Sequence, residues 1–213
     1  MKDNINADTL LTEKYITSFC SIDKGVVDKN GTKTFEHEGG ISEFLLAAYQ
    51  HLDVNYSKFY KMDNLSKLGW LASEVLLKNS FQSADYQPEE VGVILANANS
   101  SLDDDIKYWD SIKDVASPSL FVYTLPNIVI GEICIRNRFK GEQTLYIQAD
   151  FDADFIAKQV NYLLDKNILQ ACICGWVDVF AQDYKAVLFL VEKKKKENVT
   201  PFSATEMDKI FRG

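Results

Sequence analysis

Residues 144–154 combine a short strand, a sharp corner and the start of a helix, which is where many α/β enzymes hold a nucleophile. Residues 144–148 are β-prone, and apolar residues recur at helical spacing from residue 155 to residue 164. A helix N-terminus carries partial positive charge and free N–H groups, so it activates a thiol and stabilises an oxyanion. The corner contains no Ser or Cys, and Asp150 stands there instead. The position suits acyl chemistry, but the nucleophile is absent.

Asp150 is nevertheless a candidate site residue. At a helix N-terminus its carboxylate stays ionised, which makes it a weak base and a weak nucleophile. One interpretation is a side-chain cap for the helix that follows, in competition with Asp152. We predict no catalytic residue of the ordinary kind in this chain.

Arg136, Arg138 and Lys140 form the clearest basic cluster in a chain whose formal net charge is −8. They lie at the end of a helix expected over residues 128–139, where the helix dipole favours cations. A solvated helix end is one interpretation of the cluster, and a docking site for an acidic protein is the other. The negative net charge argues against a nucleic-acid partner, because phosphates would be repelled.

Residues of the types that bind metals are scattered along the chain. The four cysteines lie in apolar runs, and strand alternation places Cys172 and Cys174 on one face. A zinc site would need two further ligands, but His37 and His51 belong to other segments. The acidic run at residues 103–105 suits a solvent-facing helix start. We therefore interpret the cysteines as buried and reduced, and we predict no metal site and no cofactor.

Strands and helices alternate along the chain. Strands are expected at residues 15–22, 90–96, 144–148, 169–177 and 185–192. Helices are expected at residues 41–52, 63–79, 128–139, from the corner to 164, and 203–211. Residues 26–38 are a polar excursion with a hairpin turn at Asn30-Gly31. The order predicts an α/β fold with a mostly parallel, five-stranded sheet, helices on both faces and an antiparallel last pair.

Short motifs follow one another through the centre of the chain: Ser117-Pro118, Leu125-Pro126-Asn127, Gly131-Glu132-Ile133 and Lys140-Gly141, then a strand and Ala149. In this order they resemble the N-terminal half of the β-ketoacyl-[acyl carrier protein] synthases, which have the thiolase fold. The resemblance extends from residue 14 to residue 192. It implies a thiolase-like half-fold that forms one domain, residues 1–213.

The resemblance also shows what the chain lacks. In the family, the residue after the corner Ala is the acyl-accepting Cys, and Asp150 occupies that position here. The family needs two histidines, or one His and one Asn, for decarboxylation, and these belong to its C-terminal half. His37 and His51 match neither of them. Without the covalent step no acyl-enzyme forms, so we expect no condensing activity.

Chain-length-factor subunits of type II polyketide synthases resemble this pattern, because they keep the fold, lack the Cys and pair with an active ketosynthase. Short ketosynthase-like proteins of aryl-polyene and related pigment clusters are also similar. The resemblance therefore implies a non-catalytic protein of fatty-acid or polyketide biosynthesis. An acyl-binding module and an acyl-thioester hydrolase that uses Asp150 are the alternatives.

The family resemblance implies partners as well. In the family, the strand before the nucleophile lies near the dimer interface, and residues 144–148 are the corresponding strand. A half-fold would leave apolar surface exposed, so we expect a homodimer or a heterodimer with a ketosynthase. Carrier proteins are acidic, and an acyl carrier protein would therefore dock on Arg136, Arg138 and Lys140.

The N-terminal residues 1–6 contain no apolar segment of the kind found in a signal peptide. No uncharged apolar run reaches the roughly 18 residues that a membrane span needs. With 46% hydrophobic and 25% charged residues, the composition is that of a globular protein. We expect a cytoplasmic location and no membrane span.

Overall fold

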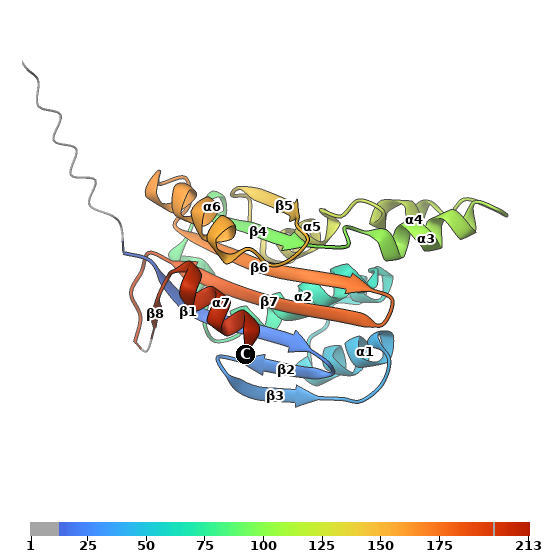
Figure 1. Ribbon diagram of the computed structural model, residues 1–213, viewed down its shortest axis with the longest axis horizontal. Coiled ribbons are helices and arrows are strands. Elements are labelled where there is room, and N and C mark those ends of the chain that lie inside the picture. The colour runs from blue at the N-terminus through green and yellow to red at the C-terminus, as the bar shows by residue number, and fades with distance from the viewer. Residues whose placement is uncertain (1–12, 198) are drawn as a thin grey trace, which may run out of the picture.

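A mixed sheet with helices on both faces organises the computed structural model, which describes residues 13–197 and 199–213 (Figure 1). The strands are β1 (Tyr15–Asp23), β2 (Val26–Lys29), β3 (Thr32–Glu36), β4 (Val91–Asn97), β5 (Gln143–Ile147), β6 (Ala171–Phe180), β7 (Asp183–Glu192) and β8 (Thr200–Pro201). The α-helices are α1 (Ile41–Leu52), α2 (Asn64–Leu77), α3 (Leu102–Ser111), α4 (Pro118–Tyr123), α5 (Ile128–Asn137), α6 (Ala153–Asp165) and α7 (Ala204–Arg212). The expectation about a signal peptide rests on residues 1–6, which lie outside the described residues.

The sheet has eight strands in the order β3-β2-β1-β7-β6-β4-β5, with β8 beside β1. Within the described residues, β4 makes the parallel pairs, with β5 and β6, and the other pairs are antiparallel. The α/β fold with helices on both faces is confirmed, and the five expected strands form the continuous run β1-β7-β6-β4-β5, with β5 at the edge. The sheet is mixed, however, rather than mostly parallel.

The position of β7 accounts for this difference. Only Ala181 and Gln182 separate β6 from β7, so this last pair is antiparallel as predicted. Strand β7 then lies between β6 and β1 and is antiparallel to β1 as well. The polar excursion adds two further strands, because its predicted turn at Asn30-Gly31 closes the β2–β3 hairpin, with Lys29 opposite Thr32.

The central strands are buried on both faces, which explains their continuous apolar sequences. Along β6, Cys172, Cys174 and Trp176 belong to the apolar cluster beneath α6 and α7. Ile173 and Val177 belong to the opposite cluster, beneath α1, α2 and α5. The prediction that Cys172 and Cys174 share a face is therefore confirmed. All four cysteines are buried and free.

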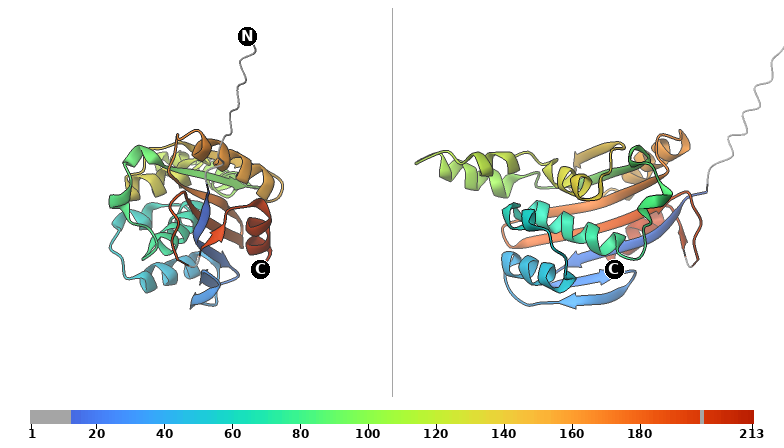
Figure 2. Two further views of the ribbon diagram at one scale, coloured as in Figure 1. Left: turned by 90° about the vertical axis from the view of Figure 1, so that its left-hand side faces the viewer. Right: turned by 180° about the vertical axis from the view of Figure 1, so that it is seen from behind.

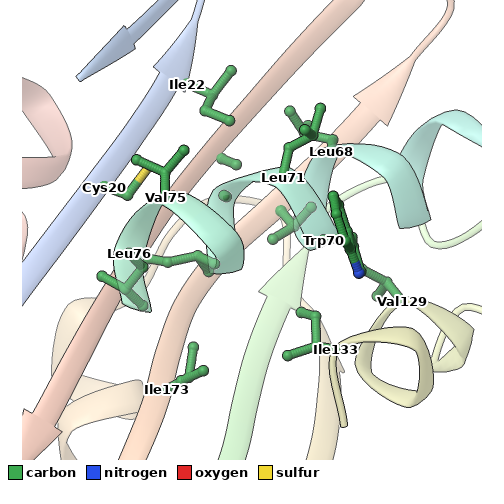
Figure 3. Packing of buried hydrophobic residues seen from close by; sticks show 14 of the residues in the cluster. Cys20, Ile22, Leu68, Trp70, Leu71, Val75, Leu76, Val129, Ile133 and Ile173 are labelled. Carbon is green, nitrogen blue, oxygen red and sulfur yellow. The ribbon is translucent and has the colours of Figure 1, made fainter. Parts of the chain in front are cut away.

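Helix α2 is the centre of the first layer. The Asp63 carboxylate caps it and accepts hydrogen bonds from the backbone N–H groups of Leu65 (3.1 Å) and Ser66 (3.0 Å). Trp70 and Leu76 are fully buried among side chains from β1, α5 and β6 (Figure 3). The helix thus covers the middle of the sheet, where burial of apolar surface stabilises the fold most.

Helices α3 and α4 project from one end of the molecule (Figures 1 and 2). We call residues 102–125 the arm. Large apolar side chains on it are exposed, among them Ile106, Trp109, Val115, Phe121 and Leu125. Trp109 is 64% exposed and Val115 is 81% exposed.

Across residues 13–197 and 199–213, helices with the length and apolar character of a membrane span are absent.

Candidate functional site: the bend between β5 and α6

The bend at residues 148–152 leads from the edge strand β5 into α6. The chain leaves the sheet where the Gln148 N–H donates to the Asn97 carbonyl (2.9 Å). Helix α6 begins at Ala153. Asp150 lies between these points with its side chain exposed. The structure thus places Asp150 in a corner between sheet and helix, where the sequence predicts it.

Asp152, and not Asp150, caps α6. Its Oδ1 accepts a hydrogen bond from the Phe155 N–H at 2.9 Å, and its backbone is extended, as at an N-cap. The sequence offers both carboxylates as candidates for the cap, and in the structure Asp152 is the one that stabilises the helix. Asp150 is free of that role.

Phe151 holds the bend in place. Its ring is buried and stacks on Phe211 of α7, with 4.3 Å between centroids. It also lies at 6.3 Å from the ring of Trp176 and 6.4 Å from that of Phe189. Aromatic packing of this kind fixes a side chain between two layers. Because Phe151 points inward, its neighbour Asp150 points toward solvent.

A polar hollow of about 660 Å³ lies between the bend and α7. Asp150, Asp152 and Asp154 line one side, and Asp208 and Arg212 line the other. Arg212 Nε donates to both carboxylate oxygens of Asp208, at 2.9 and 2.8 Å. This hydrogen bonding raises the pKa of Arg212, and the charge of Asp150 adds to the increase. The hollow is therefore an acidic surface with one guanidinium.

The hollow has no nucleophile and base of the kind that acyl transfer requires. The residues that line it include neither Cys nor His. The thiols Cys172 and Cys174 are buried in the sheet, and burial raises the pKa of each. Burial likewise raises the pKa of Cys134 to about 12. No described cysteine is poised as a thiolate.

The two histidines are remote from the bend. His51 is on α1 and stacks on Phe35 of β3, with 4.7 Å between ring centroids. His37 follows β3, and its Nε2 lies 3.6 Å from Glu43. Strands β3 and β5 are at opposite edges of the sheet.

Within the described residues, the side chains that could bind a metal ion (His, Cys, Asp and Glu) form no group of three or more.

The three residues of the basic cluster, Arg136, Arg138 and Lys140, have different roles. The Arg136 guanidinium pairs with Glu74, with Nε–Oε1 at 3.0 Å and Nη2–Oε2 at 2.9 Å. It also lies over the rings of Tyr56 and Trp70. Arg138 and Lys140 are exposed. Arg136 therefore joins α5 to α2, whereas the other two present positive charge to solvent.

Asp178 stabilises the turn after β4. Its Oδ1 accepts from the N–H groups of Ala98 (3.1 Å) and Asn99 (2.9 Å), and its Oδ2 accepts from the Asn99 side chain (2.7 Å). Ser100 has a positive φ of 54°. Polar residues thus form this turn, and the hydrogen bonds to the Asp178 carboxylate fix its backbone.

Comparisons with known proteins identify the fold. No family model matches the sequence, and no curated protein matches it. Among solved structures, the chain is similar to the ishigamide ketosynthase/chain length factor, with a TM-score of 0.61 and 15% identity over 89% of this chain and 64% of that one. It is also similar to the ketosynthase ApeO in complex with its chain length factor ApeC from Xenorhabdus doucetiae, with a TM-score of 0.54 and 13% identity over 86% and 80%.

A third similar structure is AntDE:AntF, a type II polyketide synthase acyl-carrier protein in complex with its ketosynthase. Here the TM-score is 0.59 and the identity is 13%, over 85% of this chain and 62% of that one. The chain spans less than two thirds of the ishigamide and AntDE:AntF chains. At these identities the likeness establishes the fold, which is the thiolase-like fold of ketosynthases and chain length factors. The fold that the sequence resemblance implies is thereby confirmed.

Proposed function

We propose that this chain is a non-catalytic, ketosynthase-like subunit of fatty-acid or polyketide biosynthesis that acts beside an active ketosynthase. The single observation that carries the proposal is the bend at Asp150. A ketosynthase-like fold is present, yet an exposed carboxylate stands at the corner, and no Cys or His lines the adjoining hollow. Such a site lacks the thiol and the imidazole on which ketosynthase chemistry depends. Aryl-polyene-type pigment synthesis is one setting in which we place it.

The edge of the sheet supports a partner subunit. Strand β5 pairs with β4 on one side, and no other described strand pairs with it. Ile147 at its end is 53% exposed, and Ile135 on the neighbouring α5 is 62% exposed. Open strand edges and clustered apolar side chains are usually covered. We propose that a second chain covers β5 and the arm, either a ketosynthase or another copy of this chain.

Arg138 and Lys140 are the proposed docking residues for an acyl carrier protein, with Arg136 holding their helix in place. Both are exposed, and carrier proteins are acidic. Lys140 Nζ lies 3.7 Å from Glu89 at the surface, a pair that solvent screens strongly. We further propose that residues 1–213 act as one domain and that the protein is cytoplasmic.

Co-expression with an active ketosynthase tests the proposal. We expect a heterodimer by size-exclusion chromatography with light scattering. Ile147→Lys should weaken the complex at least tenfold, because it places an ammonium in an apolar contact. Tyr60→Lys is the matched control, since Tyr60 is 62% exposed on the 3-10 turn Ser57–Lys61, away from β5.

Two results would count against the proposal. One is a monomer that binds neither ketosynthase nor carrier protein at micromolar concentrations. The other is acyl-thioester turnover by the purified chain that disappears in Asp150→Ala, which would favour the hydrolase instead. Carrier-protein binding is tested separately with Arg138→Glu, for which Lys33→Glu on the distant β3 is the control.

A further inference from the structure

An apolar cavity of about 230 Å³ lies at the sheet edge opposite the bend, between the β2–β3 hairpin, α1 and α2. Its walls are formed mainly by Ile22, Val27, Phe35, Ala48, Leu71 and Val75. Figure 3 shows that Ile22 on β1 faces Leu71 and Val75 on α2. The cavity is separate from the hollow at Asp150 and shares no lining residue with it.

The cavity opens beside two lysines. Lys29 and Lys78 line it together with His51, and Lys78 and His51 are exposed. Lys29 Nζ donates to the Lys78 carbonyl, and its side chain is half-buried. Burial lowers the pKa of Lys29, and the Lys78 ammonium nearby lowers it further, although Cys20 acts in the opposite direction. Across the described ranges, no carboxylate lies within 4.0 Å of either lysine Nζ, whereas other lysines of the chain form such pairs.

We propose that this cavity binds a small carboxylic acid with an apolar tail, with the tail among Ala48, Leu71 and Val75 and the carboxylate on Lys29. An ammonium has three hydrogens, and one of those on Lys29 already goes to the Lys78 carbonyl. Two hydrogens of the ammonium remain, and they match the two oxygens of one carboxylate. The bound anion would supply the counter-charge that a partly desolvated cation lacks.

The size and lining of the cavity restrict the ligand further. Its volume is below the roughly 300 Å³ at which sites for drug-sized molecules begin, so the tail is of medium length or a single aromatic ring. Strongly polar ligands are disfavoured because the inner wall offers mostly methyl and aromatic groups. Amines are disfavoured by the two lysines at the mouth.

Titration of the full chain with octanoate, octylamine and octanol tests this inference by calorimetry and by NMR of the methyl groups of Ala48 and Val75. We expect octanoate to bind and to shift these methyl signals. Octanol should bind at least tenfold more weakly, and octylamine should not bind. Equal affinities for octanoate and octylamine, or no binding of octanoate at millimolar concentration, would overturn it.

Two variants locate the site. Lys29→Met keeps the apolar stem and removes the charge, so it should weaken octanoate about tenfold and leave octanol unchanged. Lys33→Met is the control, since Lys33 lies on the same hairpin and pairs with Glu36. Ala48→Leu fills the cavity and should abolish binding of both ligands, with the melting temperature confirming the fold. Unchanged octanoate affinity in Lys29→Met would contradict the proposal, whatever the behaviour of Ala48→Leu.

Discussion

At the scale of single residues, the bend assigns different roles to two neighbouring carboxylates. Asp152 accepts from the Phe155 N–H, whereas Asp150 is exposed. We therefore predict that Asp152→Ala lowers the free energy of unfolding by about 1 kcal/mol, as the loss of an N-cap does, and that Asp150→Ala changes it by less than about 0.5 kcal/mol. Urea denaturation of the two variants measures this. An equal loss in both would mean that the two carboxylates share the cap.

A second residue-scale prediction concerns Asp63, which lies at the junction of α2 and the arm. Burial and the adjacent Asp104 carboxyl raise the pKa of Asp63 to about 8. Between roughly pH 4 and pH 8 the folded chain thus holds a proton that the unfolded chain releases, so stability falls as the pH rises. Asp63→Asn keeps the cap and mimics the protonated acid.

The wild type should therefore lose on the order of a few kcal/mol more than Asp63→Asn between pH 5 and pH 9. Asp110→Asn is a suitable control, because Asp110 is an exposed residue of the same arm that pairs with Lys113. Urea denaturation at several pH values makes the comparison. Parallel pH profiles for wild type and Asp63→Asn would show that Asp63 is ionised throughout.

At the scale of elements, Gly69 sets how closely α2 approaches α5. A Cβ at this position would lie 2.4 Å from Val129 Cγ2 and 3.4 Å from Val177 Cγ1. Alanine normally favours a helix over glycine by roughly 1 kcal/mol. We predict that Gly69→Ala nevertheless destabilises the fold by about 1–3 kcal/mol, because Val129 is buried and cannot move away. Adding Val129→Ala should recover part of the loss, and additive losses in the double variant would refute direct contact.

The sequence predicts most elements, the hairpin at Asn30-Gly31 and the antiparallel last pair, but not the position of β7 between β6 and β1. Periodicity locates the strands and the long helices because each buries a regular pattern against the sheet. It misses α4, since Ser117-Pro118 resembles a turn, yet Ser117 caps that helix and Pro118 occupies its first turn. The buried helix expected at residues 128–139 leaves Ile135 exposed. Periodicity shows where apolar side chains recur, but it does not show whether another surface covers them.

The candidate site residues likewise differ in how far the local sequence predicts their roles. The place of Asp150 follows from local sequence, because a strand and a helix must meet there. The cap at Asp152 is local as well, because Phe155 lies three residues further on, and the sequence leaves open only the choice between Asp150 and Asp152. The roles of Arg136 and Asp178 depend instead on contacts with Glu74 and with the turn after β4. Contacts between segments distant in sequence leave no local periodic signal. Only the assembled sheet brings them together.

At the scale of the whole molecule, β3 and β5 form the two edges of the sheet. The β2–β3 hairpin, α1 and the proposed carboxylate cavity lie toward the first edge, and β5, the bend and the arm lie toward the second (Figure 1). The proposed partner subunit would meet the second edge, at β5 and the arm. Ligand binding at the first edge and subunit pairing at the second would be independent, unless α2, which reaches toward both, transmits a shift.

The tryptophans report on such pairing. The chain has three, and Trp70 and Trp176 are buried, whereas Trp109 on the arm is 64% exposed. We predict that acrylamide quenches Trp109 in the free chain, and that binding of a ketosynthase shifts its emission to the blue and removes most of that quenching, because the apolar arm becomes covered. Trp109→Phe should abolish the change while the chain still binds. If the complex forms and Trp109 stays as accessible as before, the arm is not the interface, and β5 alone must carry it.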